Sequence, residues 1–310
     1  MLPTLFHIFG EPVPAYFVML MTGFVVATWL GVRWAKQQGL DHQVIIDLGL
    51  YSLIAGVAGG RILHVLADGY FWDYVHLCTD PTQVVWHVDH ARCTQIEGVW
   101  DAAINACRPP GRDCLAWAAF WSGGLAYYGG LISATAYGLY FLRKQKFPMW
   151  KGADMAGLVI PVGLFFGRLG CFLGGCCFGQ PTSGLFGVRF PAWSPASESQ
   201  AKAHLIAHPW EESLSVYPTQ LFESIGCLGI AAVLMFVVHP RKQFDGQVFS
   251  AFLVLYALLR FVIEFLRADD RGGLLSLSTS QWISALAIAA VAILYNRLAA
   301  ARNAGLQRPA

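Results

Sequence analysis

Three arginines stand inside segments that are otherwise apolar: Arg61, Arg168 and Arg260. An arginine at the centre of a membrane helix costs about 2.5–3.5 kcal/mol on insertion scales, so such residues usually line a cavity or a site. A guanidinium group binds phosphate through two parallel hydrogen bonds. The three residues therefore predict a site for an anionic phospholipid that enters from the outer leaflet.

Two glutamates and a tyrosine belong to the same predicted cluster. Glu264 follows Arg260 by four residues and Tyr256 precedes it by four, so the three share one helix face. Glu223 lies near the outer start of another apolar stretch. The alternative is a structural network in which Arg260 pairs with Glu264 and Arg61 with Glu223, because buried ions are normally paired. Three arginines against two glutamates would still leave one positive charge over.

The composition indicates that membrane helices position these residues. The chain has 310 residues, of which 56% are hydrophobic and 13% charged, whereas soluble proteins average about 25% charged residues. This excludes a soluble globular enzyme and a disordered chain. The net charge of +2 is too small and too scattered for a nucleic-acid-binding protein.

Seven stretches are long and apolar enough to cross a bilayer, which takes about 20 residues. They are residues 14–34, 44–66, 122–142, 153–177, 219–239, 248–266 and 282–299. The predicted fold class is an all-α integral membrane protein with seven transmembrane helices. We expect a single polytopic membrane domain over residues 1–310, with extracytoplasmic loops at 67–121 and 178–217.

The distribution of basic residues predicts the orientation. With the N-terminus outside and the C-terminus in the cytoplasm, eleven Lys and Arg residues fall in short inner segments, and seven, among them Arg267, fall in longer outer ones. This satisfies the positive-inside rule. It places Arg61, Arg168 and Arg260 in the outer halves of their spans, so the site faces the extracytoplasmic side.

Four of the eight cysteines agree with this orientation. Cys78, Cys93, Cys107 and Cys114 lie in the loop that it places outside, and an even number of cysteines there predicts two disulfides, in one of three pairings. A zinc site is the alternative, although no close C-x-x-C pair is present.

The other four cysteines lie in or next to predicted spans. Cys171, Cys176 and Cys177 lie near the oxidising face, as the thiols of a membrane thiol–disulfide oxidoreductase would. Vicinal cysteines lack the C-x-x-C spacing of common redox sites, and the competing interpretation is that they are small packing residues. Cys227, deep in its span, is interpreted as a packing residue.

Several ordered motifs, spread over nearly all seven spans, resemble the prolipoprotein diacylglyceryl transferase family. Gly59-Gly60-Arg61 resembles the family's G-A-R, and Asp154 matches an acidic residue that opens a span. The longer motifs are GGLAYYGGL at 123–131 (G-G-M-S-F-H-G-G-L in the family), GRLGCFLGGCCFG at 167–179 (G-R-[IL]-G-N-F-x-N-G-E-x-[WY]-G), YPTQLFE at 217–223 (H-P-S-Q-L-Y-E) and YALLRFVIEFLR at 256–267 (Y-x-x-x-R-F-x-x-E-F-x-R).

The resemblance implies an enzyme of lipoprotein maturation in the bacterial inner membrane. Such enzymes move the diacylglyceryl group of phosphatidylglycerol to the lipobox cysteine thiol of a prolipoprotein signal peptide and release glycerol-1-phosphate. The implied partners are this lipid, the signal peptide and the bilayer, with no nucleic acid, no cofactor and no metal ion. Carried over by motif position, the catalytic residues would be Tyr128, Arg168, Tyr256, Arg260 and Glu264, and the substrate-binding residues Arg61, Gly129, Gly130, Cys171, Gly179 and Glu223.

The sequence departs from the family at positions that bear on the chemistry. Tyr128 replaces the histidine proposed to help deprotonate the thiol, Cys171 replaces an asparagine, Cys176 a glutamate and Tyr217 a histidine, and Gln180 follows the last glycine where the family often has arginine. A tyrosine is a poor base at neutral pH. Three explanations remain open: arginine stabilises the incoming thiolate while Tyr128 donates a hydrogen bond, another acceptor is used, or catalysis has been lost.

Overall fold

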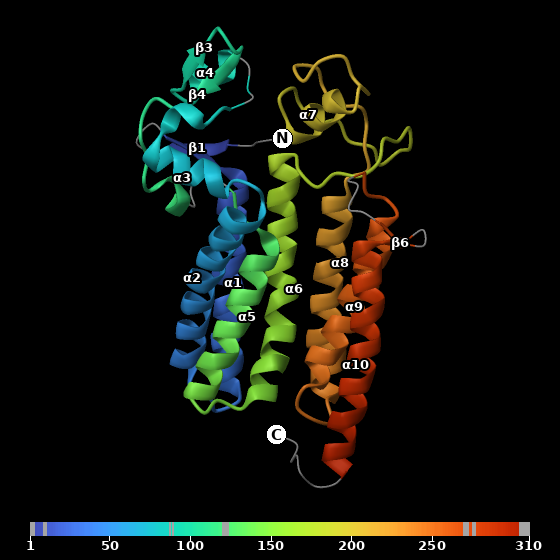
Figure 1. Ribbon diagram of the computed structural model, residues 1–310. Coiled ribbons are helices and arrows are strands. Elements are labelled where there is room, and N and C mark those ends of the chain that lie inside the picture. Colours follow the sequence, from blue (N-terminus) through green and yellow to red (C-terminus); the bar gives the residue numbers. More distant parts are fainter. Residues whose placement is uncertain are drawn as a thin grey trace. The chain divides into compact units, whose positions relative to one another are not determined.

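The computed structural model describes residues 4–8, 11–86, 88, 90–119, 124–268, 273–274 and 277–303 (Figure 1). Gly123, Arg271 and Arg308, which entered the motif and orientation arguments, lie outside them. The long helices are α1 (Ala15–Gln37), α2 (His42–Ala67), α5 (Tyr127–Lys144), α6 (Met149–Gly174), α8 (Thr219–Val233), α9 (Gln247–Glu264) and α10 (Thr279–Asn303). The shorter helices are α3 (Phe71–Thr79), α4 (His90–Gln95) and α7 (Pro195–Lys202), and antiparallel strand pairs are formed by β1 (Thr4–Ile8) with β2 (Glu11–Pro14), β3 (Val99–Asp101) with β4 (Ala106–Arg108), and β5 (Gly273–Leu274) with β6 (Leu277–Ser278).

Six of the helices in the described part of the chain are long and apolar enough to cross a membrane. They are α1, α2, α6, α9, α10 and the segment Thr219–Arg241, in which α8 continues through a π-helical turn and a 3₁₀ turn. The seventh predicted stretch, 122–142, overlaps α5, which does not reach the same hydropathy. Four tyrosines and a terminal Arg-Lys pair lower its apolar character. The structure thus supports a helical membrane protein, and the seventh span stays a prediction.

The chain divides into two compact units. The first unit combines residues 1–45 with 147–310, and in it α6 packs against α1, α8 and α9, while α9 packs against α10. Small residues let these helices approach: a Cβ on Gly23 would lie 2.8 Å from the Cβ of Phe166 and 3.2 Å from the carbonyl oxygen of Gly163. Close packing at small residues is typical of membrane helices, because no hydrophobic effect drives them together.

The second unit covers residues 46–146 and contains a similar contact between α2 and α5. A Cβ on Gly59 would lie 2.7 Å from the carbonyl oxygen of Gly129 and would collide with the side chain of Ser133. One turn away, a Cβ on Gly130 would lie 3.2 Å from the carbonyl oxygen of Gly56. The two helices therefore approach backbone to backbone along these glycines.

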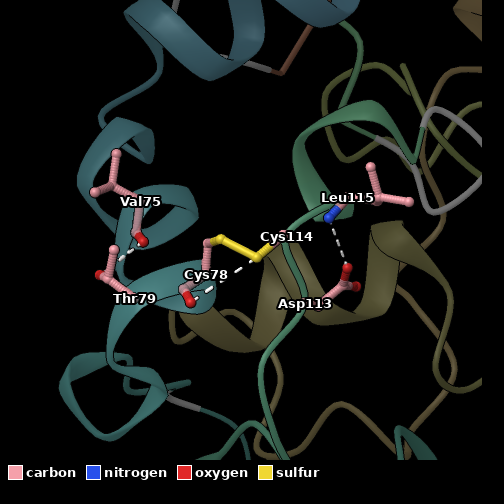
Figure 2. The surroundings of a disulfide bond; sticks show 6 residues. All are labelled: Val75, Cys78, Thr79, Asp113, Cys114 and Leu115. Atoms are coloured by element: carbon pink, nitrogen blue, oxygen red, sulfur yellow. Dashed lines mark hydrogen bonds between the residues drawn. A yellow bond between two sulfur atoms is a disulfide. The ribbon is translucent and has the colours of Figure 1, made fainter.

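Two disulfides cross-link the segment between α2 and α5. Cys78 is joined to Cys114, and Cys93 to Cys107, which is one of the three pairings that the sequence allows. The structure pairs these sulfurs with one another, which leaves none of the four for the alternative zinc site. Figure 2 shows the first disulfide between the end of α3 and the segment that precedes Leu115.

The hairpin of β3 and β4 adds an ion pair to this cross-linked segment. Arg108 Nε donates to Asp101 Oδ2 at 2.8 Å, and this hydrogen bond lowers the pKa of Asp101. The segment 178–217 of the first unit has a small apolar core of its own, in which Phe190, Ala196 and Val216 are fully buried. That core fixes the chain immediately after α6.

Candidate functional site

A buried ion pair links α6 to α8. Arg168 Nη2 lies 3.0 Å from Glu223 Oε1, and the Tyr256 hydroxyl on α9 donates to the same oxygen at 3.3 Å. The Glu223 side chain is 1% exposed, and its other oxygen has no hydrogen-bond partner among the described residues. Three predicted site residues from three helices are thus in contact. Glu223, which the alternative of a structural network paired with Arg61, forms its ion pair with Arg168.

A second ion pair lies within α9, one turn of helix further on. Arg260 Nη2 lies 2.6 Å from Glu264 Oε2 and 3.5 Å from the Ser280 hydroxyl on α10. This is the pairing that the spacing of four residues predicts. The other terminal nitrogen of Arg260, Nη1, is buried and has no hydrogen-bond partner in the part of the chain that the structure describes. Arg260 therefore retains a donor that a bound anion would satisfy.

A third buried arginine follows α9. Arg267 is 6% exposed and forms a β-bridge with Gly179, while the neighbouring Gln180 N–H donates to the carbonyl of Leu266 at 2.8 Å. Gly179 has no room for a side chain, because a Cβ there would lie 2.8 Å from the Cβ of Tyr217. The sequence analysis placed Arg267 in an outer loop, although its position as the last residue of the 256–267 motif could have identified it.

Three arginines and two glutamates lie on or next to these helices in the described part of the first unit: Arg168, Arg260 and Arg267 with Glu223 and Glu264. The predicted surplus of positive charge counted Arg61, which belongs to the second unit, and it stays a prediction. Arg267 acts together with Arg168 on the thiol of Cys177.

Three thiols gather immediately beyond the Arg168 pair. The sulfur atoms of Cys171, Cys176 and Cys177 all lie within 4.8 Å of one another, and none of the three cysteines forms a disulfide. The fourth free cysteine, Cys227, is buried in α8 and does not belong to this group. The packing interpretation therefore fits Cys227 but does not account for the convergence of the other three.

The two thiols beyond the end of α6 differ in acidity. Hydrogen bonds from the Cys171 and Cys176 thiols, followed by the charges of Arg267 and Arg168, lower the pKa of Cys177 below its ordinary value. The pKa of Cys176 is raised, because its own thiol bonds to Cys171 and Cys177. The group therefore favours a thiolate at Cys177.

Arg61 occupies a different setting, in the second unit. Its guanidinium donates to the backbone carbonyls of Trp117 at 2.7 Å, Ala116 at 2.6 Å and Gly124 at 3.2 Å, and it lies 5.2 Å above the ring of Tyr74. These bonds tie the segment that precedes α5 to α2. A substrate-binding role for Arg61 stays a prediction.

His64 lies one turn from Arg61 on α2. Its Nδ1 lies 2.7 Å from Asp68 Oδ2, and its Nε2 lies 3.4 Å from the Tyr74 hydroxyl. A Cβ on Gly124 would collide with the imidazole, so this position requires glycine. The sequence analysis named no histidine as a site residue and did not identify this pair, whose signal was an aspartate four residues after the histidine.

Tyr128 and the two glycines after it open α5. Tyr128 is 56% exposed and its ring packs edge-to-face on Tyr127, with the ring centroids 5.6 Å apart. Gly129 and Gly130 lie in the contact with α2, as the close approach of Gly59 and Gly56 requires. Helix packing accounts for both glycines, and their role in binding a substrate stays a prediction.

The fold and the site together define a multi-pass helical membrane protein with a cationic cluster among its helices. The family profile of prolipoprotein diacylglyceryl transferase matches residues 3–101 and 105–297. The chain belongs to this family of transferases, which confirms the resemblance recognised in the motifs. Together with the six apolar helices, family membership marks it as a multi-pass protein of the bacterial inner membrane.

Individual relatives match this chain over most of their length. The chain is 29% identical to phosphatidylglycerol–prolipoprotein diacylglyceryl transferase 2 of Clostridium perfringens over 294 residues, which are 94% of this chain and 93% of that one. It is 26% identical to the phosphatidylglycerol–prolipoprotein diacylglyceryl transferase of Clostridium tetani, over 93% of this chain and 94% of that one. The transferase of the same name from Paenarthrobacter aurescens is 28% identical over 90% of this chain and 76% of its own length.

Proposed function

We propose that the protein transfers the diacylglyceryl group of phosphatidylglycerol to the lipobox cysteine thiol of prolipoproteins. The names of its relatives and the nearly complete family match support this reaction. The observation that carries the proposal is the open donor of Arg260, whose buried Nη1 has no acceptor among the described residues. A buried N–H group of a cation is costly without a hydrogen-bond acceptor, and a bound ligand would supply that acceptor.

The reaction forms one carbon–sulfur bond and breaks one carbon–oxygen bond. The thiolate of the acceptor attacks the glyceryl carbon that carries the phosphate, the bond from that carbon to the phosphate oxygen breaks, and glycerol-1-phosphate leaves with the bonding electron pair. The thiol proton passes to a base. Positive charge at the phosphate lowers the barrier, because negative charge accumulates on the leaving oxygen.

The arginines divide this work in the proposed mechanism. Arg260 binds the phosphate through Nη1, while Glu264 holds the opposite edge of its guanidinium. Arg168 adds charge from α6 and is oriented by Glu223 and the Tyr256 hydroxyl. Gly179 keeps the chain close to this cluster. Removal of either arginine would cost catalysis several orders of magnitude, by analogy with the loss of an oxyanion-stabilising donor, about 10²–10³-fold each.

Tyr128 stands where the family has histidine, and a tyrosine is a poor base at neutral pH. In the proposed mechanism the charge of Arg168 or Arg260 stabilises the incoming thiolate, and Tyr128 donates a hydrogen bond to the sulfur.

The proposed orientation puts the N-terminus outside and the C-terminus in the cytoplasm, in one polytopic domain of seven spans with α5 among them. The site then faces the extracytoplasmic side, to which the loops 67–121 and 178–217 also belong. Reporter fusions after Asn303 test this orientation. A C-terminal green fluorescent protein should be bright and a C-terminal alkaline phosphatase inactive, and the opposite pattern contradicts the orientation.

The activity is tested with purified protein, phosphatidylglycerol vesicles and a synthetic lipobox peptide, with the mass of the peptide as the readout. We expect a diacylglyceryl thioether from the wild type and from Arg143→Ala, an exposed control at the end of α5. Arg168→Ala and Arg260→Ala should give none. Retained lipid binding without product from any lipobox peptide would favour the alternative of a different acceptor.

The role of Tyr128 is tested separately. Tyr128→Phe removes the hydroxyl that would donate to the sulfur, so it should lower kcat while KM for the lipid stays unchanged. An unchanged kcat in Tyr128→Phe would exclude the hydroxyl from the reaction.

A further inference from the structure

The group formed by Cys171, Cys176 and Cys177 has the composition of a metal site. Their sulfur atoms lie within 4.8 Å of one another, and the group contains no histidine or carboxylate. Three sulfurs at about 2.3 Å from a common ion lie about 4.0 Å apart in a trigonal plane. The three thiols could thus reach such an ion with side-chain shifts of less than about 1 Å.

The backbone holds two of these cysteines in place from outside the group. The carbonyl of Cys177 accepts from the Thr219 hydroxyl at 2.8 Å, and that of Cys176 accepts from Gln220 Nε2 at 2.7 Å. Both donors belong to α8 and are buried. This clamp fixes the loop after α6 independently of any contact between the thiols.

The turn itself is conformationally costly. Cys177 has a φ of 63°, a left-handed conformation that a residue with a side chain rarely adopts. Such a conformation is unfavourable and persists where the surroundings enforce it, commonly at ligand sites. The conformation brings Cys177 back toward Cys171 in the last turn of α6.

The three thiols remain unpaired although the protein forms disulfides elsewhere. Cys78 with Cys114 and Cys93 with Cys107 are joined, whereas the cysteines of the three-thiol group are free despite the short distances between their sulfurs. Their side chains are partly exposed, so an ion could enter. Packing alone does not require three thiols to face one another at a partly open position.

We propose that Cys171, Cys176 and Cys177 bind one Cu(I) ion through three thiolates. Soft thiolate ligands select Cu(I), zinc or iron–sulfur clusters. Structural zinc sites use four ligands, and the described residues supply three sulfurs without a fourth donor in the group. A three-sulfur set is complete for Cu(I). Binding releases the thiol protons, and the nearby charges of Arg168 and Arg267 offset the negative charge of the thiolates.

Competition with a chromophoric Cu(I) chelator under anaerobic conditions tests the site on the full-length protein in detergent. The wild type and Cys227→Ser should each withdraw about one Cu(I) per chain. Cys171→Ser, Cys176→Ser and Cys177→Ser should each lower the affinity for Cu(I) by at least about 100-fold. The loss of a residue that only hydrogen-bonds a metal ligand already lowers affinity by up to about 100-fold, and the loss of a ligand itself should cost at least as much. Copper K-edge absorption should report three sulfur neighbours at about 2.3 Å.

Three results would overturn the proposal. The first is equal Cu(I) affinity in the wild type and in any of the three serine variants that elutes as a folded protein in size exclusion. The second is tight Zn(II) binding in a parallel titration with no competition for Cu(I). The third is a disulfide between two of these cysteines in protein isolated without reductant, found by mass after alkylation. None of these readouts depends on the transferase activity.

Discussion

The ion pair between Arg168 and Glu223 yields a test that separates its structural and chemical roles. In Arg168→Met, the Glu223 carboxylate stays buried, with a side chain 1% exposed, and keeps only the Tyr256 hydroxyl at 3.3 Å among its described partners. Removing one partner of a buried pair typically costs about 3–5 kcal/mol. The Arg168 side chain is itself 21% exposed, which places the expected loss toward the lower end, about 3 kcal/mol.

The matched variant removes both charges at once. Arg168→Met combined with Glu223→Leu leaves no isolated ion, and such apolar replacements of buried pairs are often neutral or stabilising. We therefore expect the double variant to lie within about 1 kcal/mol of the wild type. It should still give no thioether product, because it lacks the positive charge that Arg168 is proposed to place at the phosphate.

Unfolding in mixed micelles with a rising fraction of dodecyl sulfate, followed by far-ultraviolet circular dichroism, measures these free energies. Arg143→Met, at an exposed position, serves as the control and should change stability by less than about 0.5 kcal/mol. The reasoning fails if Arg168→Met is as stable as the wild type, or if the double variant is as unstable as the single one. A stable double variant with full activity would show that Arg168 is a counter-ion and not part of the proposed chemistry.

Two further perturbations have equally definite outcomes. Gly179→Ala should destabilise the first unit by about 1–3 kcal/mol in the same unfolding assay, because the added Cβ meets the carbonyl oxygen of Leu266. Gly167 has open space around it, so Gly167→Ala should be neutral or slightly stabilising. Alkylation of Cys177 by iodoacetamide should persist at pH values below those at which an ordinary cysteine stops reacting, because its lowered pKa keeps the thiolate present as pH falls. Peptide mass spectrometry that finds Cys177 no more reactive at low pH than Cys227 would contradict the assignment of the thiolate.

The sequence was sufficient for the helices and for the local ion pair, for identifiable reasons. Apolar length follows directly from bilayer thickness, so six of the seven predicted stretches fall on helices that could cross a membrane. The spacing of four residues brings Arg260 and Glu264 together on any helix, and the structure contains that pair. The motifs led to the family because they are long and ordered.

The same reasoning could not predict the contacts between helices. The sequence offered Arg61 as a partner of Glu223 only in the alternative of a structural network, and it did not indicate Arg168, because the packing of α6 on α8 brings that cation to Glu223. Arg267 was counted as a loop residue because its burial depends on a bridge to Gly179, 88 positions earlier in the chain. The convergence of Cys176 and Cys177 with Cys171 depends likewise on a left-handed turn that residue types do not reveal.

The division into two units has a consequence for how the protein is made. Residues 46–146 are contiguous, whereas the first unit is split around them, and Gly23 on α1 meets Phe166 on α6. At about 5–20 residues per second, the ribosome needs about 7–29 s to reach Phe166 after it has passed Gly23. Throughout that interval the second unit can complete its own folding, while α1 waits in the bilayer without the helix it packs against. α1 is synthesised before α6 and thus reaches this neighbour late, so the face that carries Gly23 lacks this partner until then.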